Sequence, residues 1–321
     1  MKRLFSLLVS LGILAVIYWR MDFTRLGPVF AACDPLWMTL SLGMVVPLTL
    51  ATAWRLGQLM PRGARPGPLE LNRLILVASV LNLVLPSKMG DLAKAWFMKE
   101  RGHLRGELAF ALVIFEKACD MISLLLWCAF GLLLYPEKNG LFWTMTACVV
   151  AGLAGGILML GSRGLSGFVF RVSGRMLPEK WGVRLARLEA GWREMHGFFW
   201  RDRARLALVA STSIFIWFLH LLQIWMFILA LRAQTPFLAS LALAPLAILA
   251  GLLPFTFAGV GTRDAALIFF FRHFLDTPTA AALGILCTMR YVLPAIGGLP
   301  FVQGFLPGFR AMRKHDATGK N

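Results

Sequence analysis

The sequence predicts an all-α polytopic membrane protein with about six to eight transmembrane helices. Only 15% of its 321 residues are charged and 58% are hydrophobic, whereas ordinary soluble domains carry about 25% charged residues. Several apolar runs approach or exceed the roughly 20 residues that cross a bilayer as a helix. Two runs are interrupted by Pro and Gly beside charged residues, which predicts two re-entrant helical hairpins in an inverted-repeat-like arrangement. We therefore expect one integral-membrane domain over residues 1–321.

The basic residues predict the orientation of the chain. Nine of them lie between Arg55 and Arg105, ten between Arg163 and Arg205, and four from Arg310 onward. The positive-inside rule then places these segments and both termini in the cytoplasm, and we expect the inner membrane of a bacterium. Nucleic acid is not an expected partner, because the charges flank apolar spans and no nucleic-acid-binding motif accompanies them.

The first half of the chain, about residues 1–161, has four apolar runs expected to cross fully, at 4–19, 36–54, 108–135 and 141–160. Segment 69–105 is expected to be re-entrant from the cytoplasmic side, because its apolar part is short and a full crossing would carry the basic residues after it outside. Non-helical backbone at membrane depth requires surrounding protein or a water-filled cavity. A full crossing by this segment is the alternative, and for the whole chain eight spans is the nearest alternative to six.

An amphipathic segment separates the two halves. Apolar residues recur every three or four positions from Trp181 to Phe199, with charged residues between them. This pattern predicts a cytoplasmic amphipathic helix over about 165–203, which lies on the inner leaflet or packs on the protein's own spans.

The second half, about residues 204–310, repeats the plan of the first. A span at 206–231 precedes a second re-entrant segment at 237–275, and the last span begins near Thr279 and leads to a basic tail at 310–321. The charged residues also recur. Asp91 precedes Glu116 by 25 positions and Asp264 precedes Arg290 by 26, which indicates a diverged internal repeat.

The two breaks are candidate anion sites. The residues that interrupt the helices are Pro86, Gly90, Pro254, Gly259 and Gly261. Where a helix restarts, free backbone N–H groups and the positive end of the helix dipole favour anions. Lys88 and Lys94 flank the first break and Arg263 flanks the second, which together suit a phosphate-bearing headgroup. Kinks that serve helix packing alone are the alternative.

Charged side chains at membrane depth are a second candidate feature, since each costs at least ~2.5–3.5 kcal/mol at the bilayer centre. Glu116 and Asp120 are four residues apart, so their carboxylates share one helix face. Arg290 is an expected partner for one of them or for a lipid phosphate, which its planar fork suits. A buried network that only fixes helix packing competes with this interpretation. His220 and Gln223 are expected to form helix–helix hydrogen bonds.

No metal-ligand spacing, catalytic constellation or phosphate-binding loop motif accompanies these residues in the sequence. We therefore expect no catalytic residue, no metal site and no cofactor.

Four ordered motifs resemble the flippase-like family typified by the transmembrane domain of lysylphosphatidylglycerol synthetase. The first, Asn…Pro-x-[Arg/Lys]-x-Gly-[Glu/Asp]-x-x-[Arg/Lys], is met by Asn82, Pro86, Lys88, Gly90, Asp91 and Lys94. The second, Glu-[Arg/Lys]-x-x-Asp, is met by Glu116, Lys117 and Asp120. A later Pro- and Gly-containing segment is met by Pro254, Gly259, Gly261 and Asp264, and an Arg in the last helices by Arg290. The sequence departs from the pattern at Ala258, where Gly is common, and at Asp264, where Glu is common.

The resemblance covers nearly the whole chain and implies translocation of a lipid or lipid-linked intermediate between leaflets. The soluble aminoacyl-transferase domain of the fused synthetases is absent from this sequence, so lysyl transfer is not implied. The residues expected to bind the substrate are Asn82, Lys88, Asp91, Lys94, Glu116, Asp120, Arg263, Asp264 and Arg290.

The sequence thus predicts flipping or transport of an anionic phospholipid or lipid-linked intermediate, with membrane lipids as the main partner. The alternative is a non-transporting accessory subunit that presents lipid to a lipid-modifying enzyme or glycosyltransferase. The sequence leaves open which lipid is moved, in which direction, by what energy source and in what oligomeric state.

Overall fold

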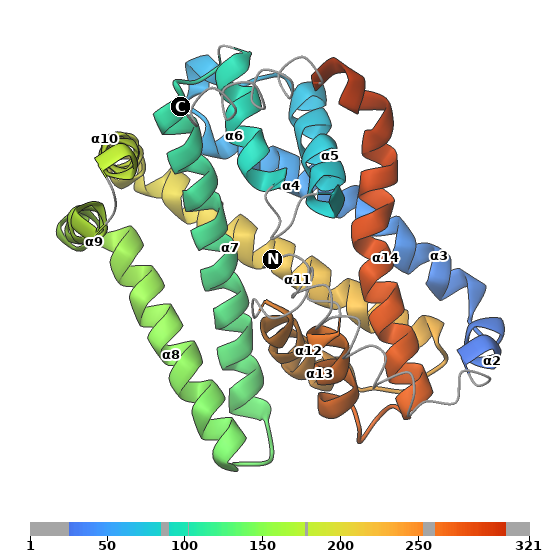
Figure 1. Cartoon of the computed structure of the whole chain (residues 1–321). Coiled ribbons are helices and arrows are strands. Elements are labelled where there is room, and N and C mark those ends of the chain that lie inside the picture. Colours follow the sequence, from blue (N-terminus) through green and yellow to red (C-terminus); the bar gives the residue numbers. More distant parts are fainter. Residues whose placement is uncertain (1–25, 85–89, 102, 177–178, 253–260, 306–321) are drawn as a thin grey trace.

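The computed structural model describes residues 26–84, 90–101, 103–176, 179–252 and 261–305 (Figure 1). All regular secondary structure in these ranges is helical, which confirms the predicted all-α class. The predicted span at 4–19 and the basic tail at 310–321 lie outside the described residues. So do four residues of the predicted breaks: Pro86, Lys88, Pro254 and Gly259.

The first described helices are α2 (Leu26–Ala31), α3 (Pro35–Gly43) and α4 (Val45–Leu59). Asp34 caps α3 by accepting hydrogen bonds from two backbone N–H groups of its first turn, as an N-cap carboxylate does. Hydrogen bonds on both sides of Met44 keep α3 and α4 nearly continuous. Together they cover the span predicted at 36–54, and α4 is followed by the short 3₁₀ helix η2 (Arg62–Ala64).

The first predicted hairpin consists of two short helices packed on each other, α5 (Pro68–Val84) and α6 (Gly90–Glu100). At 1.5 Å rise per residue they are about 26 Å and 17 Å long, shorter than the roughly 30 Å apolar core of a bilayer. Gly90 lies so close to the backbone of Ala78 and Asn82 that a Cβ atom there would collide with it. The short paired helices agree with a hairpin, and its entry from the cytoplasmic side stays a prediction.

The next helices are α7 (Gly106–Leu134) and α8 (Gly140–Gly161), followed by α9 (Arg163–Met176) and α10 (Glu179–Arg201). The prediction of a single amphipathic helix over 165–203 is wrong, because this segment forms two helices. Pro178 lies between them in the sequence, and a proline inside a helix removes a backbone hydrogen bond and clashes with the preceding turn.

The two amphipathic helices use their apolar faces differently. Trp192, Met195 and Phe199 of α10 are buried, and α10 packs on α7, so this helix packs on a span of the protein itself. On α9, in contrast, Phe168 and Met176 are 58% and 83% exposed. Of the two predicted positions for an amphipathic helix, α10 therefore packs on the protein, and only α9 has an exposed apolar face that suits the membrane surface.

The second half contains α11 (Arg203–Ala230), α12 (Phe237–Gly251), α13 (Thr262–Phe270), α14 (Thr277–Val302) and the 3₁₀ helix η5 (Gln303–Phe305). The short helices α12 and α13 pack on each other and form the counterpart of α5 and α6. In Figure 1 the two short pairs lie toward opposite ends of the bundle, while α7 and α14 run along its length.

Four stretches of the described chain are long and apolar enough to cross a membrane: Pro35–Leu59, Gly140–Gly161, Arg203–Ala230 and Thr277–Phe305. The 29-residue helix α7 also has the required length, and it carries the charged residues of the candidate site. The protein is thus a polytopic helical membrane protein, as predicted.

Close glycine contacts join the two halves in a reciprocal way. A Cβ atom on Gly131 of α7 would collide with the carbonyl oxygen of Ala242 in α12, and one on Gly298 of α14 would collide with that of Leu76 in α5. The long helix of each half therefore packs backbone to backbone on the first hairpin helix of the other half. Each short helix pair is thereby fixed to the long helix of the opposite half.

Candidate functional site

A cavity of about 590 Å³, lined by apolar side chains together with a cluster of charged ones, lies where the two halves meet. Helices α4, α5, α6, α7, α11, α12, α13 and α14 all contribute side chains to its wall. Seven of the nine predicted substrate-binding residues line it: Asn82, Asp91, Lys94, Glu116, Asp120, Arg263 and Arg290. Asp264 bonds to Arg263, and Lys88 lies outside the described residues.

Six charged side chains on the cavity wall form a closed ring in which cations and carboxylates alternate. We call it the charge ring, and its members are Arg55, Asp91, Lys94, Glu116, Lys117 and Asp120. Each carboxylate contacts two cations and each cation contacts two carboxylates. Three positive and three negative charges make the ring electrically neutral.

Glu116 is the most buried carboxylate of the ring, with no exposed side-chain area. Its Oε1 lies 3.0 Å from Arg55 Nη2, and its Oε2 lies 2.8 Å from Lys94 Nζ. Arg55 also contacts Asp120 and donates to the Ser213 hydroxyl at 2.9 Å. These contacts tie α4, α6, α7 and α11 together.

The remaining contacts close the ring. Lys94 Nζ lies 3.3 Å from Asp91 Oδ1. Lys117 Nζ lies 2.9 Å from Asp91 Oδ2 and 3.3 Å from Asp120 Oδ2. Because residues one helical turn apart share a face, α6 can supply Asp91 with Lys94, and α7 can supply Glu116 with Asp120.

Arg55 is the functional residue that the sequence reasoning missed. It was counted among the cytoplasmic basic residues, yet only 2% of it is exposed. The feature of the sequence that indicates its burial is its position directly after the apolar run that ends at Trp54. Lys117, a charged residue of the same apolar segment as Glu116 and Asp120, completes the ring in the structure.

The predicted pairing of Arg290 with Glu116 or Asp120 is wrong, because Arg55, Lys94 and Lys117 occupy the oxygens of both carboxylates. Arg290 Nη2 instead donates to the Tyr291 hydroxyl at 2.8 Å, and its guanidinium lies over the Tyr291 ring. Its Nε and Nη1 have no hydrogen-bond acceptor within the described part of the chain. The other half of that prediction, a lipid phosphate as partner, stays open.

Arg263 and Asp264 form a second neutral unit at the start of α13. Arg263 Nη2 lies 2.7 Å from Asp264 Oδ1 and also donates to the Gly284 carbonyl at 3.0 Å and the Thr288 hydroxyl at 2.8 Å. Asp264 Oδ2 accepts from the N–H of Gly261 at 3.0 Å. Gly261 has a φ of 100°, a conformation that favours glycine. This unit fastens α13 to α14.

The prediction for Gln223 as a helix–helix contact is confirmed. Its Nε2 donates to the Ser41 carbonyl at 2.8 Å, which joins α11 to α3. His220, one turn away, stacks edge-on against Trp217 and lines the cavity.

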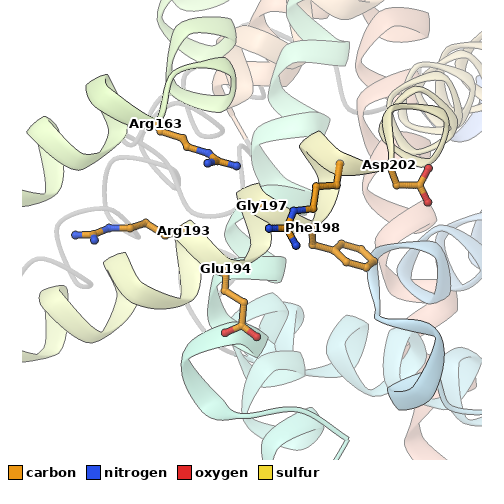
Figure 2. Close-up of a pocket in the computed structure, with 7 residues that line it drawn as sticks. Arg163, Arg193, Glu194, Gly197, Phe198 and Asp202 are labelled. Atoms are coloured by element: carbon orange, nitrogen blue, oxygen red, sulfur yellow. The ribbon is translucent and has the colours of Figure 1, made fainter.

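A second hollow of about 620 Å³ lies along the amphipathic helices, lined by Arg163, Arg193, Glu194, Gly197, Phe198, Arg201 and Asp202. Figure 2 shows that its labelled charged side chains point in different directions and do not converge on one point. Arg193 pairs with Glu189 while 70% of its side chain is exposed. We therefore place the candidate site in the central cavity.

Within the described ranges, no group of three or more His, Cys, Asp and Glu side chains is arranged to hold a metal ion. The chemistry that the cavity offers is electrostatic: fixed charges, amide groups and hydroxyls inside an apolar bundle.

Comparison with known proteins identifies the family. A model described as the lysylphosphatidylglycerol synthase TM region matches residues 3–298. The chain belongs to this family. It is also similar to a UPF0104 membrane protein of Methanocaldococcus jannaschii, with 25% identity over 242 residues that cover 70% of this chain and 71% of that protein. The resemblance inferred from the four motifs is thus confirmed for nearly the whole chain, and the protein is a multi-pass membrane member of the lysylphosphatidylglycerol synthase TM-region family.

Proposed function

We propose that this family member moves an anionic phospholipid, or a lipid-linked intermediate with an anionic headgroup, between the leaflets of the cytoplasmic membrane. The observation that carries the proposal is the charged cavity of about 590 Å³ inside an apolar helical bundle, with walls from both halves of the chain. Ionisable residues at membrane depth are costly and usually mark a pathway for a polar substrate.

The two short helix pairs support an alternating route to this cavity. We propose that α5–α6 and α12–α13 are re-entrant hairpins that enter from opposite sides of the membrane. Paired interrupted helices in the two halves of a transporter commonly flank a binding site near the midplane. The headgroup would occupy the cavity while the acyl or prenyl tails stay in the surrounding lipid.

The charged groups have separate roles in this proposal. The charge ring holds α4, α6 and α7 together at the cavity, Arg55 also bonds to Ser213 of α11, and the Arg263–Asp264 pair fixes α13 to α14. Arg290 remains available for the phosphate of the headgroup. The sequence contains no nucleotide-binding motif, so we expect movement to be passive or coupled to an ion gradient.

A dithionite assay on liposomes tests the proposal. The purified protein is reconstituted with a trace of lipid that carries a fluorescent group on its acyl chain or headgroup, and external dithionite bleaches the outer leaflet. Movement between leaflets leaves less residual fluorescence than in protein-free vesicles. Several lipid classes are compared, and residual signals equal to those of empty vesicles for all of them would refute lipid movement.

The same assay separates movement from lipid presentation. A protein that only holds lipid for a partner enzyme binds lipid in detergent but leaves the liposome signal unchanged. Arg62→Gln is the matched control, since Arg62 is an exposed arginine of η2 outside the cavity wall. It should move lipid at the parental rate, whereas Arg290→Gln should not.

A further inference from the structure

The charges of the cavity wall leave one cation without a counter-charge. The charge ring contains three cations and three carboxylates, and Arg263 is matched by Asp264. Arg290 is the remaining charged side chain among the described lining residues. The described wall, with Asp264 included, therefore carries a net charge of +1.

Arg290 is buried in a way that its own contacts do not explain. It is 5% exposed, and the Tyr291 hydroxyl and ring are the only partners recorded for it in the described chain. An isolated charge taken out of water is strongly disfavoured unless it is paired and hydrogen-bonded. A guanidinium that keeps Nε and Nη1 without acceptors is suited to an incoming anion, because two parallel N–H donors match two phosphate oxygens.

The wall also contains unpartnered acceptors but no spare carboxylate. Gln223 Oε1 and Asn82 Oδ1 accept no hydrogen bond within the described residues, and both side chains line the cavity. Amide oxygens can accept from the hydroxyl groups of a ligand. A ligand ammonium group, in contrast, finds all four described carboxylates already held by cations.

We propose that the ligand of this cavity carries one net negative charge, as a phosphodiester bound by Arg290, and that the rest of its headgroup is uncharged and bears hydroxyl groups. This inference rests on the proposed function and specifies its substrate class. It predicts discrimination against zwitterionic and aminoacylated lipids, since each additional ammonium group would be buried without a counter-charge.

Native mass spectrometry of the detergent-solubilised protein tests the proposal with lipids of identical acyl chains. Phosphatidylglycerol, phosphatidylethanolamine and lysylphosphatidylglycerol are offered in equal amounts. Phosphatidylglycerol should bind at least about tenfold more tightly than the other two, as expected for one charge-assisted hydrogen-bonded pair. Equal binding of all three lipids, or preference for an ammonium-bearing one, would overturn the proposal.

Two variants at Arg290 separate charge from geometry. Arg290→Gln should abolish the preference for phosphatidylglycerol, while Arg290→Lys should keep the preference with weaker binding, because an ammonium lacks the bidentate fork. Arg62→Gln should behave as the parent. A parental preference in Arg290→Gln would overturn the assignment.

Thermal unfolding tests whether Arg290 binds the ligand or only stabilises the packing of the helices. Removing an unpaired buried charge should leave the Tm of Arg290→Gln equal to or above that of the parent. A clearly lower Tm together with lost binding would instead assign Arg290 to helix packing and overturn its role as the ligand's partner.

The deacylated headgroup glycerophosphoglycerol distinguishes a lipid from a soluble ligand. Binding much weaker than that of phosphatidylglycerol supports a lipid substrate. If glycerophosphoglycerol binds as tightly as phosphatidylglycerol, the result supports the single negative charge of the ligand. It also shows that the acyl chains add no affinity, which refutes a lipid as the ligand. The liposome assay keeps the two proposals distinct: movement without charge preference refutes only this inference, and absence of movement with selective binding refutes only the proposed function.

Discussion

Lys94 of α6 and Glu116 of α7 form an ion pair that is closed to solvent on both sides. The Nζ and Oε2 atoms are 2.8 Å apart, and the two side chains retain 2% and 0% of their exposed area. The pair joins the first short hairpin to the long helix that follows it. Within the charge ring, Lys94 continues to Asp91 of α6 and Glu116 continues to Arg55 of α4.

Replacement of Lys94 by Met should destabilise the protein strongly. Breaking a buried ion pair typically costs about 3–5 kcal/mol because one charge stays buried without its partner. Glu116 keeps its contact with Arg55, so we expect the lower end, about 3 kcal/mol, in the free energy of unfolding measured in detergent. Arg105→Gln breaks a pair with Glu194 in which the two side chains are 73% and 47% exposed, and it should cost less than about 1 kcal/mol. Similar losses for both variants would contradict a buried, connected ring.

The reciprocal glycine contacts predict a second contrast. Gly131→Ala and Gly298→Ala should each lower the free energy of unfolding by about 1–3 kcal/mol, because the added methyl group meets a backbone carbonyl of the opposite half. Gly155→Ala in α8 adds a methyl group where no atom lies within 4 Å. It should be neutral or stabilising by up to about 1 kcal/mol through helix propensity. Thermal unfolding of the three variants checks the order, and a destabilised Gly155→Ala with intact Gly298→Ala would contradict it.

The contact between α9 and α10 should weaken in acid. Arg163 Nε donates to His196 Nδ1 at 3.0 Å, which requires a neutral imidazole. Burial, with a smaller contribution from the Arg163 charge, lowers the pKa of His196 below its ordinary value of 6.5. A lowered pKa means that the native state binds fewer protons, so this stabilisation is full above about pH 6.5 and is lost as the pH falls through the lowered native value.

Hydrogen exchange of the α9 amides measures this effect. Protection of α9 relative to the core amides of α7 should fall between pH 7 and 5 after correction for the intrinsic exchange rate. His196→Gln removes the titrating group and should make the protection of α9 independent of pH over that range. A parental pH dependence in His196→Gln would assign the effect to another group.

The apolar face of α9 should lie in the interfacial layer of the membrane. Val169 is 38% exposed on this helix, and Arg171, two residues further on and therefore on the opposite face, is exposed as well, so the pattern is typical of an amphipathic helix at a membrane surface. Spin labels at Val169→Cys and Arg171→Cys, in a background without the exposed Cys148, report the depth of each position in liposomes. Collisions with oxygen should dominate at position 169 and collisions with a water-soluble nickel complex at position 171. Equal exposure of both labels to the nickel complex would place α9 in water.

Several parts of the site followed from the sequence because they are local. Glu116 and Asp120 share a face through helical periodicity alone, and the short apolar runs around the breaks correspond to the helix pairs α5–α6 and α12–α13. Periodicity also indicated the apolar face of α10, but whether lipid or protein covers such a face is not a local property. Burial of Trp192 and Phe199 in the contact of α10 with α7 decided that question.

The sequence by itself determined that the protein is an all-α membrane protein with two pairs of short helices and with charged residues inside its apolar segments, since composition, run length and helical period depend only on neighbouring residues. The tertiary structure alone decided which charges neutralise one another. Arg55 lies 61 positions before Glu116, and their distance depends on how α4 and α7 are placed, since both helices pack on α11. The same packing gives each ring carboxylate two cations and leaves Arg290 without a carboxylate partner among the described residues.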